Sequence, residues 1–258
     1  MTGKVSVEHL TFHYDNDPPV LRDLSLTIRS GAITTLMGAN GCGKSTLLQI
    51  LTKNLKPDSG TIRFDQAELS TISLKEFARR AAIVHQKNTA PDDLTVERLV
   101  AYGRLPYSSI FKAGLDQENQ AQVERALALT DLTELRDRRV GALSGGQRQR
   151  AFIAMALAQN TELLFLDEPT TFLDVRYQVE ILRLVERLNK EEGITIVMVL
   201  HDINQALSYS DEVIGLLDGQ VSIQGPPEEV ITSESIQTLY GIDLPVIRAD
   251  GRLCVMAV

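Results

Sequence analysis

The sequence predicts a mixed α/β fold that carries a helical insert, and three observations support this. An apolar run of strand length, 32–37, is followed at once by a glycine-rich turn and a helix pattern at 45–51. Helical patterns then dominate from about residue 90, and strands and helices alternate again after about residue 160. We therefore expect one α/β domain over 1–258, with a core formed by 1–89 and 161–258 and a helical subdomain at 90–160.

The first part of the chain is predicted to be rich in strands. Leu24, Leu26 and Ile28 alternate with polar residues, as expected for a half-buried strand. Two further elements follow the helix at 45–51, namely a short β element after residue 60 and a helix at 74–80. A strand then runs into His85 and Gln86.

The second part has its own sequence of elements. Helices are expected at 96–103, 117–130 and 145–158, followed by a strand at 163–166 and a helix from 175 whose apolar face repeats at spacings of 4, 3 and 3. The nearly all-apolar run 194–200 is typical of a parallel strand covered on both faces. Asp-Gly pairs at 218–219 and 250–251 predict two hairpin turns.

The composition excludes several classes of protein. The 26 Lys and Arg against 34 Asp and Glu give a net charge of −8, which argues against a nucleic-acid-binding protein with a broad basic face. With 43% hydrophobic residues the chain can bury a sizeable core. We find no apolar stretch of membrane-spanning length and no signal-peptide pattern, so the expected location is the cytosol, with any membrane association through a partner. Cys42 and Cys254 are then expected to be free thiols.

A phosphate-binding loop is predicted directly after the strand at 32–37. The pattern G-x-x-x-x-G-K-[ST] is matched by Gly38, Ala39, Asn40, Gly41, Cys42, Gly43, Lys44 and Ser45. Its glycines let backbone N–H groups surround phosphate oxygens at a helix N-terminus. Lys44 would meet the β- and γ-phosphates of ATP, and the Ser45 hydroxyl would bind Mg²⁺. The alternative, a glycine turn beside an exposed lysine, does not account for a strand before the loop and a helix after it.

Two adjacent carboxylates end the strand at 163–166. Asp167 and Glu168 would be costly at the end of a buried strand unless something neutralises them. Mg²⁺ bound through Asp167 would do so, and Glu168 would then polarise a water aimed at the γ-phosphate. Alone, the pair could be a solvated strand end.

A second anion site is predicted at the start of the helix at 145–158. Ser144 can cap that helix, and Gly145 and Gly146 expose backbone N–H groups before Gln147. One nucleotide needs one phosphate loop, so a second phosphate site suggests two chains that share each ATP. The string Leu143 to Gln147 resembles the signature of ATP-binding cassette (ABC) transporter ATPases, and the resemblance covers essentially the whole chain.

The resemblance implies a RecA-like P-loop NTPase core with an N-terminal antiparallel β subdomain and an inserted helical subdomain. It also implies roles for single residues, and Thr46 joins the loop residues that bind ATP. Tyr14 would stack on adenine, and Gln86 would contact Mg²⁺ and the attacking water. His201 would contact the γ-phosphate, and Asp174 would link the two halves of a dimer. Taken singly, Tyr14 could be an edge-strand aromatic, His201 a helix cap and Gln86 a loop amide.

The family further implies a mechanism and partners. Two copies would pack head to tail with ATP between Lys44 of one and Ser144 of the other; binding closes the dimer, and hydrolysis assisted by Glu168 reopens it. A chain without its own membrane span needs separate permease subunits, which would hold it peripherally on the cytoplasmic side of the inner membrane. An importer would also use an external substrate-binding protein.

Three strings resemble the ATPases of ferric siderophore, haem and vitamin B12 importers, namely 103–107, 169–174 and 239–241. We therefore expect iron-chelate import. The string at 103–107 could instead be a proline-terminated helix with a surface tyrosine. Two other classes stay open: an ABC ATPase of iron–sulfur cluster assembly that is not coupled to transport, and a non-enzymatic nucleotide sensor.

Overall fold

The computed structural model describes residues 3–15, 17–107 and 116–256, and its contacts divide the chain into two units. The first unit joins 1–72 to 195–258, and the second covers 73–194. The helices expected in the insert at 90–160 all belong to the second unit, while the boundaries of that subdomain stay a prediction. Across the described ranges, every helix is too short or too polar to cross a lipid bilayer.

The first unit contains an antiparallel sheet and a largely parallel one. The antiparallel sheet has the order β2-β1-β4-β5, and in the parallel part β3 lies between β8 and β9. The strands are β1 (Gly3–Phe12), β2 (Leu21–Arg29), β3 (Ile33–Met37), β4 (Ser59–Phe64), β5 (Ala67–Glu68), β8 (Thr195–Val199), β9 (Glu212–Leu217), β10 (Gln220–Gly225), β11 (Val246–Ala249) and β12 (Arg252–Val255). Its helices are α1 (Lys44–Leu51), α7 (Ile203–Tyr209), α8 (Pro227–Val230) and α9 (Ser233–Tyr240). The predicted mixed α/β class with an antiparallel N-terminal sheet is confirmed.

Burial follows the hydrophobic patterns of these strands. In β2 the buried residues alternate with exposed ones, whereas every residue of β3 and of β8 is buried because each strand is covered on both faces. Both predicted hairpins form. Asp218 and Gly219 have φ of 49° and 80°, and Asp250 and Gly251 have 48° and 78°, the left-handed pairs that a tight two-residue hairpin requires.

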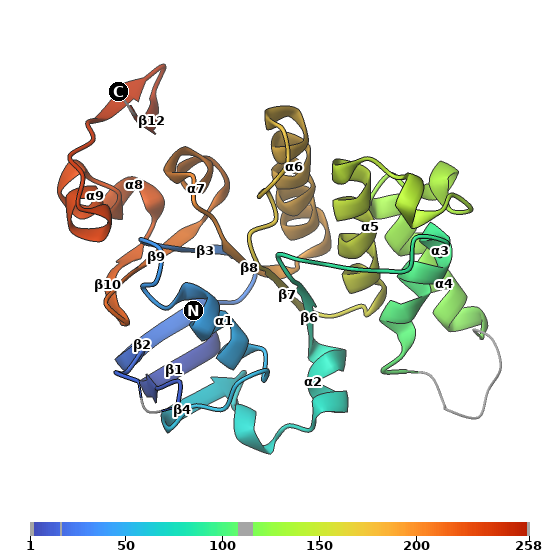
Figure 1. The fold of residues 1–258 in the computed structure, drawn as a ribbon, viewed down its shortest axis with the longest axis horizontal. Coiled ribbons are helices and arrows are strands. Elements are labelled where there is room, and N and C mark those ends of the chain that lie inside the picture. Colours follow the sequence, from blue (N-terminus) through green and yellow to red (C-terminus); the bar gives the residue numbers. More distant parts are fainter. Residues whose placement is uncertain (1–2, 16, 108–115, 257–258) are drawn as a thin grey trace. The chain divides into compact units, whose positions relative to one another are not determined.

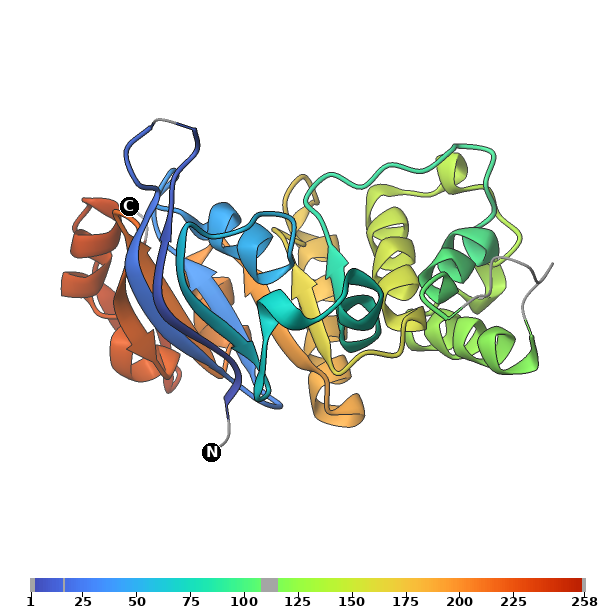
Figure 2. The same ribbon diagram turned by 90° about the horizontal axis from the view of Figure 1, so that it is seen from below.

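The second unit gathers its helices around α5. Its elements are α2 (Leu74–Arg80), β6 (Ala81–Val84), α3 (Val96–Ala101), α4 (Gln117–Leu129), α5 (Gly145–Ala158), β7 (Leu163–Leu166) and α6 (Val175–Glu192). Strands β6 and β7 pair in parallel. Figure 1 shows α3 and α4 beside α5, and Figure 2 shows the same green and yellow-green group from below. The predicted end of the helix at 96–103 is wrong, because the helix stops at Ala101 and a 3₁₀ turn follows. In that turn Gly103 packs against α5, where a Cβ would lie 2.1 Å from the Met155 carbonyl oxygen.

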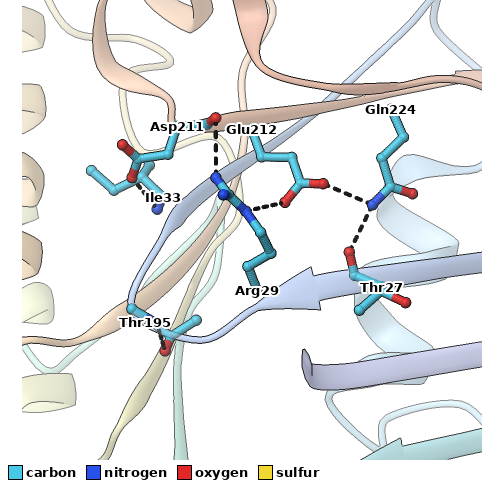
Figure 3. Close-up of polar contacts among 8 residues, drawn as sticks. Thr27, Arg29, Ile33, Thr195, Asp211, Glu212 and Gln224 are labelled. Atoms are coloured by element: carbon cyan, nitrogen blue, oxygen red, sulfur yellow. Dashed lines mark hydrogen bonds and ion pairs between the residues drawn. The ribbon is translucent and has the colours of Figure 1, made fainter. Parts of the chain in front are cut away.

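A buried carboxylate ties the two sheets of the first unit together (Figure 3). Glu212 at the start of β9 accepts hydrogen bonds from Arg29 Nε on β2 at 3.1 Å and from Gln224 Nε2 on β10 at 2.8 Å. Gln224 also donates to the Thr27 carbonyl at 2.8 Å, and Arg29 Nη2 donates to the Asp211 carbonyl at 3.3 Å. The Glu212 side chain is only 9% exposed, so its partners compensate for lost hydration.

We predict that Glu212→Ala lowers the free energy of unfolding by about 1–3 kcal/mol, because it leaves the Arg29 and Gln224 donors without their acceptor. Urea unfolding followed by circular dichroism measures this. The matched control is Glu8→Ala, which breaks the exposed pair with Arg63 and should cost less than about 1 kcal/mol. Equal losses in the two variants would contradict a special role for Glu212.

Candidate nucleotide site

The phosphate loop joins β3 to α1 through three glycines with positive φ. Gly38, Gly41 and Gly43 have φ of 137°, 82° and 108°. A Cβ at Gly38 would lie 2.3 Å from the Leu216 carbonyl oxygen, and one at Gly43 would lie 2.7 Å from Leu21 Cδ2. Only glycine satisfies both the conformation and the space at these two positions. Helix α1 follows directly after Gly43, and no described side chain caps its N-terminus, so its first N–H groups suit an anion.

Lys44 lies over the loop that precedes it. Its Nζ donates to the carbonyls of Gly38 at 2.7 Å and Ala39 at 2.9 Å and lies 3.7 Å from Cys42 Sγ, and the residue is 5% exposed. Cys42 is buried as well. The ammonium group is therefore held inside the loop that the sequence assigns to phosphate, whereas Ser45, the next residue, is exposed.

Tyr14 lies beside this loop. Its hydroxyl is 3.2 Å from Thr46 Oγ1, and its ring meets Phe12 edge to face at 4.9 Å between ring centres. Tyr14 is still 38% exposed, so a base could reach it and stack on its ring. The structure thus brings Tyr14 to the loop.

His201 is exposed between β8 and α7. The alternative that it caps α7 is wrong, because Asp202 is the cap: its Oδ1 accepts from the N–H groups of Asn204 and Gln205 at 2.8 and 3.0 Å.

Tyr240 is a residue of this site that the sequence analysis did not assign a role. It ends α9, and its hydroxyl accepts a hydrogen bond from the Gly38 N–H at 3.1 Å. Burial raises the pKa of Tyr240 to about 12, so the hydroxyl is neutral at physiological pH. In the sequence, Tyr240 appears only within the string 239–241 that resembles iron-chelate importers. Its contact with Gly38, 202 residues away in the chain, becomes visible only in the fold.

In the second unit, the predicted catalytic carboxylate is held by two neighbours. Glu168 follows β7 with φ of 50°, and its Oε2 accepts hydrogen bonds from Gln86 Nε2 and, at 2.9 Å, from Thr171 Oγ1. The structure thus brings Gln86 to Glu168. Asp167 is half-buried, and its N–H donates to the Val84 carbonyl of the paired strand at 2.9 Å. Among the described residues, no three His, Cys, Asp or Glu side chains form a ready-made metal cluster.

The signature segment begins α5 with a capping box. Ser144 Oγ accepts from the Gln147 N–H at 3.3 Å, and Gln147 Oε1 accepts from the Ser144 N–H at 3.1 Å. This use leaves the Ser144 hydroxyl hydrogen free to be donated to an anion. Gly145 is exposed and makes only ordinary contact with Leu173. At position 146 the packing itself requires glycine, which the sequence did not reveal. A Cβ there would lie 2.4 Å from the ring of Tyr177.

That tyrosine connects the signature segment to the predicted dimer loop. Asp174 caps α6 by accepting from the Tyr177 N–H at 3.2 Å. The structure therefore brings Asp174 and the segment 144–147 close together within the second unit. A phosphate loop in the first unit and a signature segment in the second are features typical of nucleotide-binding ATPases of the phosphate-loop type.

Comparison with known proteins agrees with this class. A family model described as ABC transporter matches residues 21–171. The "Probable siderophore transport system ATP-binding protein YusV" of Bacillus subtilis is 45% identical over 94% of this chain and 87% of its own length. A structure described as a metal-chelate type ABC transporter in an inward-facing conformation covers 99% of this chain and 98% of its own, with a TM-score of 0.85 and 28% identity. A dimeric bacterial ABC transporter cassette covers 86% and 98%, with a TM-score of 0.73 and 29% identity.

The chain belongs to the ABC transporter family. It is one of the family's ATP-binding subunits and an ATPase, which confirms the resemblance inferred from the sequence.

We predict that Tyr240→Phe raises the KM for ATP about tenfold with a smaller change in kcat, because an unsatisfied Gly38 N–H costs about 1–2 kcal/mol in the loop that binds phosphate. Steady-state ATPase assays measure both constants. Since Tyr240 stays neutral to about pH 12, the pH profile should not change. The control is Tyr209→Phe on α7 of the same unit, which should leave KM unaltered; a KM for Tyr240→Phe equal to that of the control would contradict the role.

Proposed function

We propose that the chain is the ATP-hydrolysing subunit of an importer for ferric siderophores or related iron chelates. The observation that carries this proposal is the 45% identity, over nearly the whole of both chains, to a protein named as part of a siderophore transport system. The likeness to a structure described as metal-chelate type supports it.

In this proposal each part of the site has one task. The N–H groups of the loop 38–46 and the ammonium of Lys44 bind the phosphates, and Tyr14 stacks on adenine. Glu168 takes a proton from the attacking water, and its hydrogen bonds with Gln86 and Thr171 support that role because they fix the carboxylate's orientation. His201 contacts the γ-phosphate.

Mg²⁺ is the metal that these residues fit. Ser45, Gln86 and Asp167 offer hydroxyl, amide and carboxylate oxygens, the hard donors that Mg²⁺ prefers. When bound, the ion would neutralise charge on the phosphate oxygens.

A second copy of the chain would complete the site. In each copy Ser144, Gly145, Gly146 and Gln147 would meet the ATP held by the loop of the other. Two apolar side chains beside Asp174 support such an interface, because Phe172 is 84% exposed and Val175 is 76% exposed.

Permease subunits are the second partner in this proposal, and they would hold the chain on the cytoplasmic face of the inner membrane. Within the string 103–107, Leu105 is 64% exposed, and Tyr102 just before it is 48% exposed, which supports a docking role. Arg104 in the same string is buried and binds Asn119 Oδ1 and the Ala158 carbonyl, at 2.7 and 2.6 Å. This segment is therefore more than a proline-terminated surface helix. An external binding protein would deliver the chelate.

We predict that Glu168→Gln lowers the ATPase rate by about 10²–10⁴-fold, since it removes the general base. The variant should still bind ATP and accumulate as an ATP-bound dimer, detected by size-exclusion chromatography with light scattering. Glu134→Gln, an exposed glutamate of the same unit, is the control and should turn over normally. Normal turnover by Glu168→Gln would remove that residue from the mechanism.

The proposed transport role is tested by deleting the gene and measuring uptake of ⁵⁵Fe-loaded siderophores. We expect uptake to fall to background, the wild-type gene to restore it and the Glu168→Gln gene not to do so. Affinity purification from detergent-solubilised membranes should recover a polytopic permease. Recovery of soluble cluster-assembly proteins alone, with ATPase activity intact and iron uptake unchanged, would instead favour an ATPase uncoupled from transport.

A further inference from the structure

The second unit contains a cavity of about 510 Å³ whose lining includes only Gln147 of the residues assigned above to the nucleotide site. Its lining residues come mostly from α5, which begins with the signature segment, and from α6, which follows the dimer loop. Its charged lining consists of Arg150 from α5, Arg176, Glu180, Arg183 and Arg187 from α6, and Asp131 from the segment after α4.

The positive charges around this cavity outnumber the negative ones by two. Glu180 is paired with Arg176 at 2.9 Å, and Asp131 is paired with Arg187 at 3.3 Å. Arg150 and Arg183 form no ion pair with any described carboxylate. Like charges gathered around one space repel one another, and an anion of matching charge would relieve that repulsion.

Two of the arginines also present unsatisfied donors. Nε of Arg150 and Nε of Arg187 are buried and have no hydrogen-bond partner among the described residues. A buried N–H of a charged group that makes no hydrogen bond is costly, and native proteins seldom retain one without a reason. Solvent does not reach either Nε atom, so an oxyanion in the cavity would be bound by the outer nitrogens of the guanidinium groups instead.

We propose that this cavity is a binding site for a phosphate dianion, either inorganic phosphate or the phosphate group of a small metabolite. The planar forks of guanidinium groups match phosphate oxygens, and two excess positive charges match a dianion. The volume lies within the range of about 300–1,000 Å³ for small-molecule pockets, so more than the phosphate group fits. Tyr177 supplies an aromatic wall for the remainder of such a molecule.

The site is distinct from the one that binds the phosphates of ATP in the same chain, and the proposal does not depend on what is transported. The cavity is nonetheless connected to the signature segment through one shared residue. Gln147 lines the cavity and closes the capping box with Ser144. A ligand held there would contact the first turns of the signature helix, so it would act as a regulator of the ATPase.

The test uses the full chain with Lys44→Ala, which weakens phosphate binding at the phosphate loop. Isothermal titration calorimetry with inorganic phosphate, at a protein concentration where the chain is monomeric, should show saturable binding of one phosphate per chain. Adding Arg150→Gln should weaken that binding at least tenfold, and Arg150→Lys should restore part of it because the charge returns without the planar fork.

Arg183→Gln provides a second variant that does not disturb the interior, because Arg183 is exposed. It should also weaken binding, whereas the control Arg98→Gln, an exposed arginine on α3, should not. A glycerol phosphate titration distinguishes the two sources: tighter binding than phosphate indicates a metabolite, and equal or weaker binding indicates free phosphate. No binding by the Lys44→Ala protein, or binding that neither Arg150→Gln nor Arg183→Gln alters in a folded protein, would overturn the proposal.

Discussion

The nucleotide site of the first unit depends on how closely the backbone of β9 approaches the end of β3. A side chain at Gly38 would begin 2.3 Å from the Leu216 carbonyl, so the loop is pressed against β9 on one side. Helix α1 starts directly after the loop, and no described side chain caps its first N–H groups, which suit an anion. Tyr240 fixes the same glycine from α9, and the Glu212 network fixes the start of β9. The loop is thus shaped by residues from both ends of the chain.

The second unit carries the predicted catalytic carboxylate. The Glu168 carboxylate accepts hydrogen bonds from the side chains of Gln86 and Thr171, and the residue adopts a left-handed conformation that costs a non-glycine residue of order 1–3 kcal/mol. Phe172, four residues later, has φ of 64° and an exposed ring. Two such residues in one short turn between β7 and α6 are unfavourable for stability, and strain of this kind concentrates where a function fixes the geometry. The strained turn thus supports the role proposed for Glu168.

Local patterns predicted the fold well, because each depended on neighbouring residues. The run before the phosphate loop, the helix at 74–80 and the two Asp-Gly turns needed only periodicity or turn chemistry. Tyr240 could not be assigned in this way, since its contact joins distant parts of the chain. Gly146 was attributed to exposed N–H groups, but the Tyr177 ring also excludes a side chain there. The roles of Lys44, Asp167 and Glu168 followed from the chemistry of their motifs, whereas those of Tyr14, His201 and Asp174 came from the resemblance alone. The structure adds Thr171, which donates to Glu168, and Tyr240, which accepts from Gly38.

Tyr177 contacts three features of the second unit: the signature segment, the cap of α6 and the arginine-lined cavity. Its ring lies on Gly146, its N–H is held by the Asp174 cap, and it lines the arginine cavity. Because Tyr177 belongs to the first turn of α6 and its ring excludes a side chain at Gly146, this residue joins the start of α5 to the start of α6. A ligand in the cavity that contacted this ring would lie beside both the segment with Ser144 and the turn with Asp174, the two parts to which the proposed function assigns contact with a second copy.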